Sequence, residues 1–148
     1  MPPILGWRPM SPAPEPTDYS HVPLWKKLGV KDGSRVAVVN EPDGWALEVP
    51  AGVRLLQRAS ERLDVILFFS RTERHLRRRF GVLAGYLEPA GGLWVAYPKK
   101  SSDLETDLTF ETVQAVGLDG GLVDNKSVAI DDDWSGVRFV SRLKDRSR

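Results

Sequence analysis

Three short apolar runs stand out along the chain, within residues 35–40, 64–69 and 93–97. Each run is nearly continuous, is rich in β-branched or aromatic residues, and is bounded by polar residues, glycine or proline. Runs of this kind are typical of strands that are buried on both faces, as in a parallel sheet. The pattern therefore predicts three buried strands over these ranges.

A helical period follows the second of these runs. Leu76, Phe80 and Leu83 share one face of a predicted helix over 72–87, and Thr72 is placed to cap its first turn. Weaker patterns predict helices at 22–28 and 110–117, a single helical turn at 59–63, an edge strand at 53–56, and two final strands at 126–130 and 137–143.

The alternation of these elements predicts a three-layer α/β domain, Rossmann-like, with a mostly parallel sheet. The link 131–136 between the last two strands is short, so we expect them to form an antiparallel hairpin. The connection 41–52 contains Pro42, Gly44 and Pro50, and it has no room for a normal crossover helix.

The 148 residues fit one domain, which we expect over 20–143. Residues 1–19 are rich in proline, which removes amide donors, so they predict an extended arm. This arm is either a mobile tail or a segment that docks on a second subunit. Residues 144–148 form a basic tail.

Composition narrows the function classes. The chain has no cysteine, which excludes disulfides and thiolate chemistry. Its longest apolar run is far shorter than the roughly 20 residues of a membrane helix, so we expect a cytoplasmic protein that does not enter the membrane. A formal net charge of +1 gives no general attraction for nucleic acid.

Polar residues follow the first two buried strands. Asn40 and Trp45 come after the first strand, and Ser70 and Arg71 come directly after the second. In open α/β sheets, ligands bind beyond the carboxyl ends of strands, at the point where the strand order reverses. We therefore expect these four residues to line one crevice.

The loop after the third buried strand is a candidate anion site. Lys99, Lys100 and Ser101 precede the predicted helix at 110–117. Ammonium groups, hydroxyls and a helix N-terminus together suit a phosphate or another anion. The alternative is a solvated loop whose lysines are balanced by nearby acids.

Two further polar clusters have both a structural and a functional interpretation. Asn125 and Lys126 lie where the fifth strand begins, either approaching the rim of the crevice or forming an ordinary turn. The arginine-rich stretch 71–79 could bind an acidic partner, but a solvated, salt-bridged helix face is the favoured interpretation.

Metal and nucleophile chemistry have little support. His21 and His75 are the only histidines and lack the spacing of metal ligands. The acidic run 131–133 could bind Mg²⁺, although a solvated turn is favoured. Ser70 lies outside any Gly-x-Ser-x-Gly motif, and no histidine comes late in the chain to serve as its base.

Residues 24–39, ending in Leu-Gly-Val-Lys-Asp-Gly-Ser-Arg-Val, are similar to the entry into the first strand of class I methyltransferases, and the final strand pair resembles the hairpin that closes their sheet. The resemblance implies the sheet order 2-1-3-4-6-5 and S-adenosylmethionine as cofactor. The chain departs from the family where the cofactor would bind. Asn40 and Pro42 stand in place of a glycine-rich turn, and the next strand ends near Gln57 rather than at an acid.

Three motifs resemble a family of small bacterial proteins with no assigned activity: GLWVAYPKK at 92–100, GLVDNK at 121–126 and WSGVRF at 134–139. That resemblance carries over no activity. From the predicted fold, the lysines at the edge of the crevice and the lack of a complete catalytic set, we expect a non-catalytic binding module without a cofactor, which holds an anionic small molecule or a protein partner. The alternative is a reduced methyltransferase relative that binds S-adenosylmethionine through a remodelled loop. A homodimer is a third interpretation.

Overall fold

The computed structural model describes residues 22–60 and 62–142, so the predicted arm at 1–19 and the basic tail at 144–148 lie outside the described residues. In chain order the elements are α1 (Leu24–Lys27), β1 (Arg35–Val39), β2 (Arg54–Leu56), β3 (Leu63–Phe69), α2 (Glu73–Ala84), β4 (Leu87–Pro98), α3 (Phe110–Asp119), β5 (Val123–Ala129) and β6 (Trp134–Val140).

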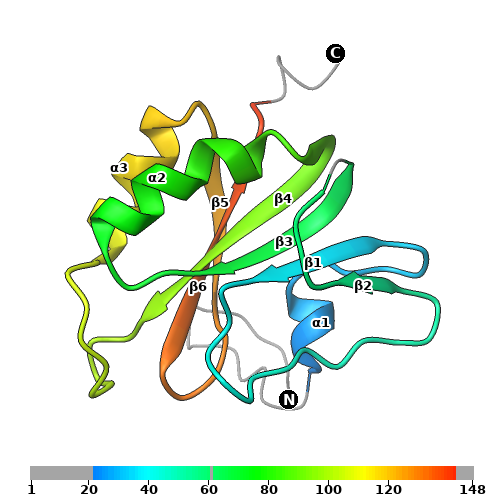
Figure 1. Cartoon of the computed structure of the whole chain (residues 1–148), viewed down its shortest axis with the longest axis horizontal. Coiled ribbons are helices and arrows are strands. Elements are labelled where there is room, and N and C mark those ends of the chain that lie inside the picture. Colours follow the sequence, from blue (N-terminus) through cyan, green and yellow to red (C-terminus); the bar gives the residue numbers. More distant parts are fainter. Residues whose placement is uncertain (1–21, 61, 143–148) are drawn as a thin grey trace, which may run out of the picture.

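The six strands form one sheet in the order β2-β1-β3-β4-β6-β5 (Figure 1). The first four of these run parallel, and β6 runs antiparallel to both β4 and β5. This arrangement confirms the predicted fold class, including the strand order and the closing hairpin. The chain leaves β1 towards one edge of the sheet and leaves β3 towards the other, so the switch point lies between β1 and β3.

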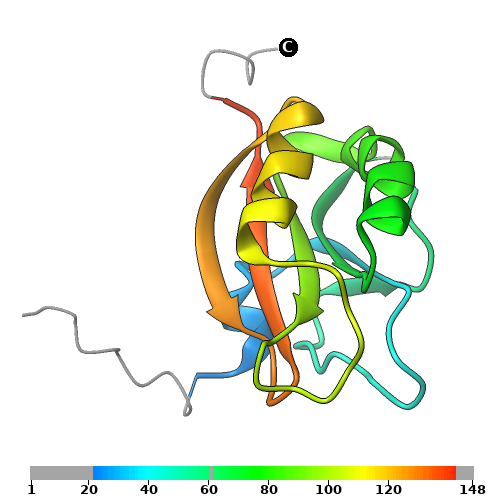
Figure 2. The ribbon, with the colours of Figure 1, turned by 90° about the vertical axis from the view of Figure 1, so that its left-hand side faces the viewer.

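Helices α2 and α3 cover one face of the sheet, and α1 lies on the other (Figure 2). Both long helices bury the apolar residues that the helical period predicts, and Thr72 and Thr109 cap their first turns. Helix α3 lies so close to β6 that a Cβ at Gly117 would stand 2.0 Å from the ring of Phe139. Within the described ranges, no helix is long and apolar enough to cross a membrane.

The opposite face is covered by α1 and by the loop between β1 and β2. In this loop Trp45, Leu47 and Val49 pack against the sheet, while the intervening Ala46 and Glu48 are exposed. The loop therefore runs across the face like an unpaired strand. The side chain of Trp94 is fully buried beneath this layer, and its Nε1 donates to the carbonyl of Leu28 at 2.9 Å.

Two local predictions are wrong. The expected helical turn at 59–63 is not formed by the described residues 59, 60 and 62, and Leu63 is already paired in β3. The expected helix 72–87 ends at Ala84, and β4 begins at Leu87 rather than at residue 93. The early start of β4 needs glycine at 91, where a Cβ would lie 2.9 Å from the carbonyl oxygen of Leu63.

Candidate functional site

A crevice of about 660 Å³ lies at the switch point, beyond the carboxyl ends of β1 and β3. Its wall is built from the segment that leaves β1, from the start of α2, and from the loop and hairpin beyond β4. The lining residues are Asn40, Glu41, Pro42, Asp43, Ser70, Arg71, Thr72, His75, Leu104, Asp133 and Trp134. Its position and size are those of a small-molecule site in an open α/β sheet.

Asn40 fixes the exit of the chain from β1. Its backbone has a φ of 61°, in the left-handed region that asparagine tolerates better than most residues. Its Nδ2 donates to the carbonyl of Phe69 at 2.9 Å, which ties the end of β1 to the end of β3. Asn40 thus makes a sharp turn where the resemblance to methyltransferases calls for glycine.

Ser70 and His75 form a hydrogen-bonded pair in the wall of the crevice. Ser70 is 1% exposed, and its Oγ lies 2.9 Å from Nδ1 of His75 and 3.3 Å from the carbonyl of Thr72. When the hydroxyl proton points to Thr72, Nδ1 carries the imidazole proton and donates to Ser70, which leaves Nε2 as an acceptor. The sequence has no histidine late in the chain to pair with Ser70, but the structure pairs Ser70 with a histidine only five residues away.

The protonation of His75 is set by its surroundings. Partial burial, followed by the charges of Arg78 and Arg79, holds the pKa of His75 below its ordinary value of 6.5. Its ring also packs on that of Phe68, with 5.2 Å between the centroids. The imidazole is therefore neutral at pH 7 and can accept a proton.

The walls of the crevice differ in charge. Glu41, Asp43 and Asp133 contribute carboxylates from the loop after β1 and from the hairpin. Arg71 contributes a guanidinium from the segment between β3 and α2, and its Nε donates to the carbonyl of Glu105 at 2.9 Å. A bound molecule would thus meet three carboxylates from two segments and one guanidinium from a third.

Trp45 lies beside the crevice without lining it. Its ring contacts Phe69 edge-on, with 4.8 Å between centroids, and its Nε1 donates to Asp131 at 3.2 Å. The other carboxylate oxygen of Asp131 accepts from the amides of Asp133 and Trp134. The acidic run 131–133 therefore shapes a turn, and no set of three metal-ligating side chains occurs among the described residues.

Lys99 and Lys100 line a different, smaller hollow of about 230 Å³ at the start of α3. Tyr97, whose pKa is raised by burial and then by the carboxylate of Glu111, lines the same hollow. Ser101 is exposed and lines none of the hollows described here. The lysines of this lysine loop (residues 99–101) thus line a hollow other than the crevice of Asn40 and Ser70, although the amide of Lys99 donates to the carbonyl of Asp133 in the crevice wall at 2.8 Å.

Asn125 and Lys126 lie farther away. Both are exposed on β5, and Lys126 pairs with Arg138, which in turn pairs with Trp94. The crevice lies at the other end of β6, where Pro98 pairs with Trp134. These two residues are therefore separated from the crevice by about half the length of β6.

Of the predicted crevice residues, Asn40, Ser70 and Arg71 do line it together. Sequence reasoning missed His75, Thr72, and the acids Glu41, Asp43 and Asp133. A usable signal was present for His75. Ser70 directly follows a strand, and Thr72 is placed to cap the next helix. His75 is then the third residue of that helix, where the first turn brings it back to Ser70.

No family model and no curated protein sequence matches the chain, so the resemblance to the small bacterial family stays a prediction. Solved structures do share its fold. An S-adenosylmethionine-dependent methyltransferase from Aquifex aeolicus has a TM-score of 0.54 at 13% identity and covers 78% of this chain and 86% of its own. A TehB-like S-adenosylmethionine-dependent methyltransferase from Corynebacterium glutamicum has a TM-score of 0.53 at 9% identity and covers 82% and 89%.

The chain is shorter than some similar proteins. It spans 52% of the magnesium protoporphyrin IX methyltransferase from Synechocystis PCC 6803, at a TM-score of 0.48 and 7% identity. At identities this low, the likenesses show the fold alone.

The comparisons correct one expectation. The chain was expected to have no cofactor, yet the solved structures that share its fold are enzymes named for their dependence on S-adenosylmethionine.

Proposed function

We propose that this chain is a reduced S-adenosylmethionine-dependent methyltransferase whose cofactor binds in the crevice between β1 and β3. The observation that carries the proposal is the position of the crevice. It lies at the switch point of a sheet whose strand order the chain has in common with methyltransferases.

The residues of the crevice fit the chemical groups of S-adenosylmethionine. Glu41 and Asp43 can accept hydrogen bonds from ribose hydroxyls and from the ammonium group, and Arg71 can bind the carboxylate. Leu104 and Trp134 offer apolar surface to the adenine ring. In methyltransferases an acid at the end of the second strand binds the ribose, and β2 has no acid there. Glu41 and Asp43, from the loop after β1, would take its place.

The positive φ of Asn40 turns the chain at the point where the backbone must pass the cofactor. Pro42 has no amide to donate, so the acids around it, rather than a row of amides, would provide the polar contacts. This is the sense in which the cofactor loop is remodelled.

The bound cofactor supplies an electrophilic methyl group. Neutral His75 can take the proton that an acceptor hydroxyl or amine releases, because its Nε2 has no hydrogen-bond partner among the described residues. Buried Ser70 holds the imidazole by its Nδ1 and so directs Nε2.

Calorimetry of the full chain with S-adenosylmethionine tests the proposal. We expect saturable binding that Asp43→Ala weakens about tenfold, the loss of roughly one charge-assisted hydrogen bond. Lys126→Ala is the matched control, because Lys126 lies on β5 away from the crevice, and it should bind as the unaltered chain does. Absence of heat at millimolar cofactor would contradict the proposal.

A further inference from the structure

The four arginines of α2 are not equivalent. Arg77 is neutralised, because its Nε lies 2.7 Å from Glu73 and its Nη1 lies 2.9 Å from Asp119 of α3. Arg74, Arg78 and Arg79 form no ion pair with any residue in 22–60 or 62–142. The helix therefore carries uncompensated positive charge on the sides that do not face α3.

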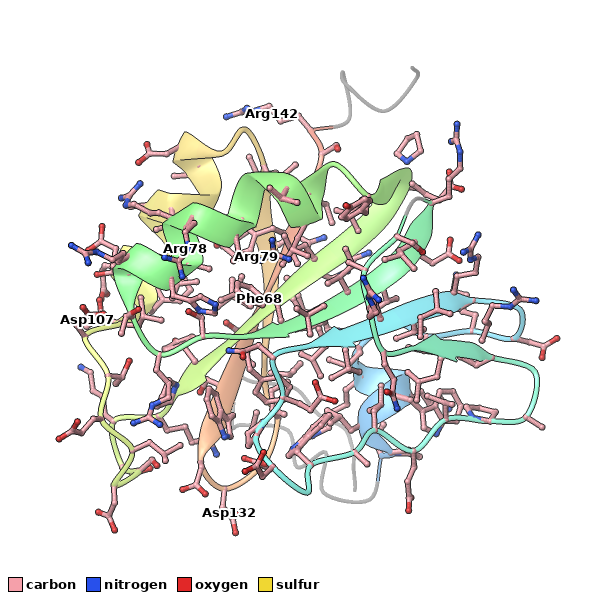
Figure 3. All side chains as sticks on the ribbon, viewed as in Figure 1. Phe68, Arg78, Arg79, Asp107, Asp132 and Arg142 are labelled. Atoms are coloured by element: carbon pink, nitrogen blue, oxygen red, sulfur yellow. The ribbon has the colours of Figure 1, made fainter. Side chains whose placement is uncertain are left out.

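This charge is concentrated around His75. Residues 75, 78 and 79 are spaced i, i+3 and i+4, which places them on one side of the helix. Figure 3 shows Arg78 and Arg79 on α2 and Phe68 on the strand β3 beneath, and His75 packs on Phe68. We call Arg78, Arg79 and His75 the arginine cluster.

The arginine cluster adjoins the crevice through His75, which lines it, whereas Arg78 and Arg79 lie outside the lining. Glu41, Asp43 and Asp133 line the crevice from the loop after β1 and from the hairpin, and these acidic walls belong to other elements than the arginine cluster. S-adenosylmethionine carries a positive sulfonium, which suits the acidic walls. A second molecule on the side of the cluster should carry negative charge.

We propose that the arginine cluster binds an oxyanion, and that the methyl acceptor of this protein is a small molecule bearing a phosphate or a carboxylate group. The acceptor part rests on the proposed function, whereas anion binding by the cluster stands without it. Guanidinium groups present paired donors in a plane, which match the oxygens of both kinds of anion. Arg79 is half-buried, and an unpaired cation in that position is stabilised by a bound anion.

The proton affinity of His75 reports on this cluster. Arg78 and Arg79 contribute to the low pKa of His75 after burial. An anion held between them would offset their repulsion of the imidazolium and would raise that pKa. Because His21 and His75 are the only histidines, a His21→Gln chain leaves one imidazole to follow by NMR.

The experiment titrates the full His21→Gln chain with inorganic pyrophosphate and, separately, with malonate. We expect at least one of them to bind and to raise the pKa of His75. The double variant Arg78→Gln/Arg79→Gln should lose about tenfold or more in affinity. Arg78→Lys/Arg79→Lys keeps the charge but loses the planar donors. Its affinity for the anion should lie between that of the His21→Gln chain and that of the double glutamine variant.

The matched control is Arg54→Gln/Arg142→Gln, which removes the same charge from two exposed side chains on other elements. Equal losses in the cluster variant and in this control would overturn the proposal, as would the absence of binding by both anions. Tighter binding of pyrophosphate would identify a phosphate-bearing acceptor, and tighter binding of malonate a carboxylate-bearing one.

Calorimetry with S-adenosylmethionine separates this inference from the function on which its acceptor part rests. Cofactor binding should be unchanged in the cluster variant, because the residues proposed to hold the cofactor, Glu41, Asp43 and Arg71, are not altered in it. Pyrophosphate binding without cofactor binding would retain the anion site and overturn the methyl acceptor. Cofactor binding without either anion would overturn the anion site alone.

Discussion

The two faces of the sheet are covered in different ways. On one face, α2 and α3 bury Phe80, Leu83 and Val113 against the strands. On the other, a helix of four residues and the loop between β1 and β2 provide the cover, with Trp45 and Leu47 among its contacts. A helix satisfies its own backbone hydrogen bonds, whereas a loop must find partners elsewhere. The crevice lies where the two kinds of cover meet.

This difference predicts that stability depends more on the helix-covered face. The largest test is Phe80→Ala, since Phe80 is 2% exposed and contacts Phe139 edge-on at 5.4 Å. We expect the free energy of unfolding to fall by about 3–5 kcal/mol, as for other large-to-small changes in a core. Urea denaturation measures it. If Phe80→Ala lowered the free energy of unfolding by less than Trp45→Ala on the other face does, the comparison would be reversed.

The corresponding test on the loop-covered face is Trp45→Ala. Trp45 is half-buried, so its removal should cost about 2 kcal/mol from lost contact with Phe69 and from the lost hydrogen bond to Asp131. Trp45→Phe keeps the ring contact and should recover about half of this loss. If Trp45→Phe were as unstable as Trp45→Ala, the hydrogen bond would hold this loop rather than the packing.

The smallest effect lies at the junction of the two faces. The pKa of His75 is lowered in the folded chain, so the unfolded chain binds the proton more readily. The contribution of His75 to stability is therefore present above about pH 6.5 and is lost as the pH falls through the interval between 6.5 and the lower folded pKa. Denaturation at a series of pH values should show this decline, and His75→Gln should flatten it.

Much of the fold could be predicted because the strands are read from local patterns. The continuous runs at β1 and β3, and the helical period of α2, need no information from the rest of the chain. The start of β4 could not be found in this way. Pro89 and Gly91 are turn signals in sequence, and only the close approach of Leu63 makes the glycine a strand residue.

The crevice could be predicted in part for the same reason. Asn40 and Ser70 end strands, and the topology alone brings strand ends together. The partner of Ser70 depends on how the chain turns into α2. The acids of the crevice come from a loop and a hairpin, and no local pattern predicts that these two segments lie side by side at the crevice. The lysine loop follows β4, whose exit leads to a separate hollow at the start of α3.

The loop between β1 and β2 also bears on the design of such proteins. Parallel strands are usually joined by a helix, but here alternate side chains of an extended segment cover the sheet instead. A designer could therefore reach this strand order with only two helices of ordinary length. The residues that follow Asn40 could then be exchanged for new binding groups without rebuilding a helix.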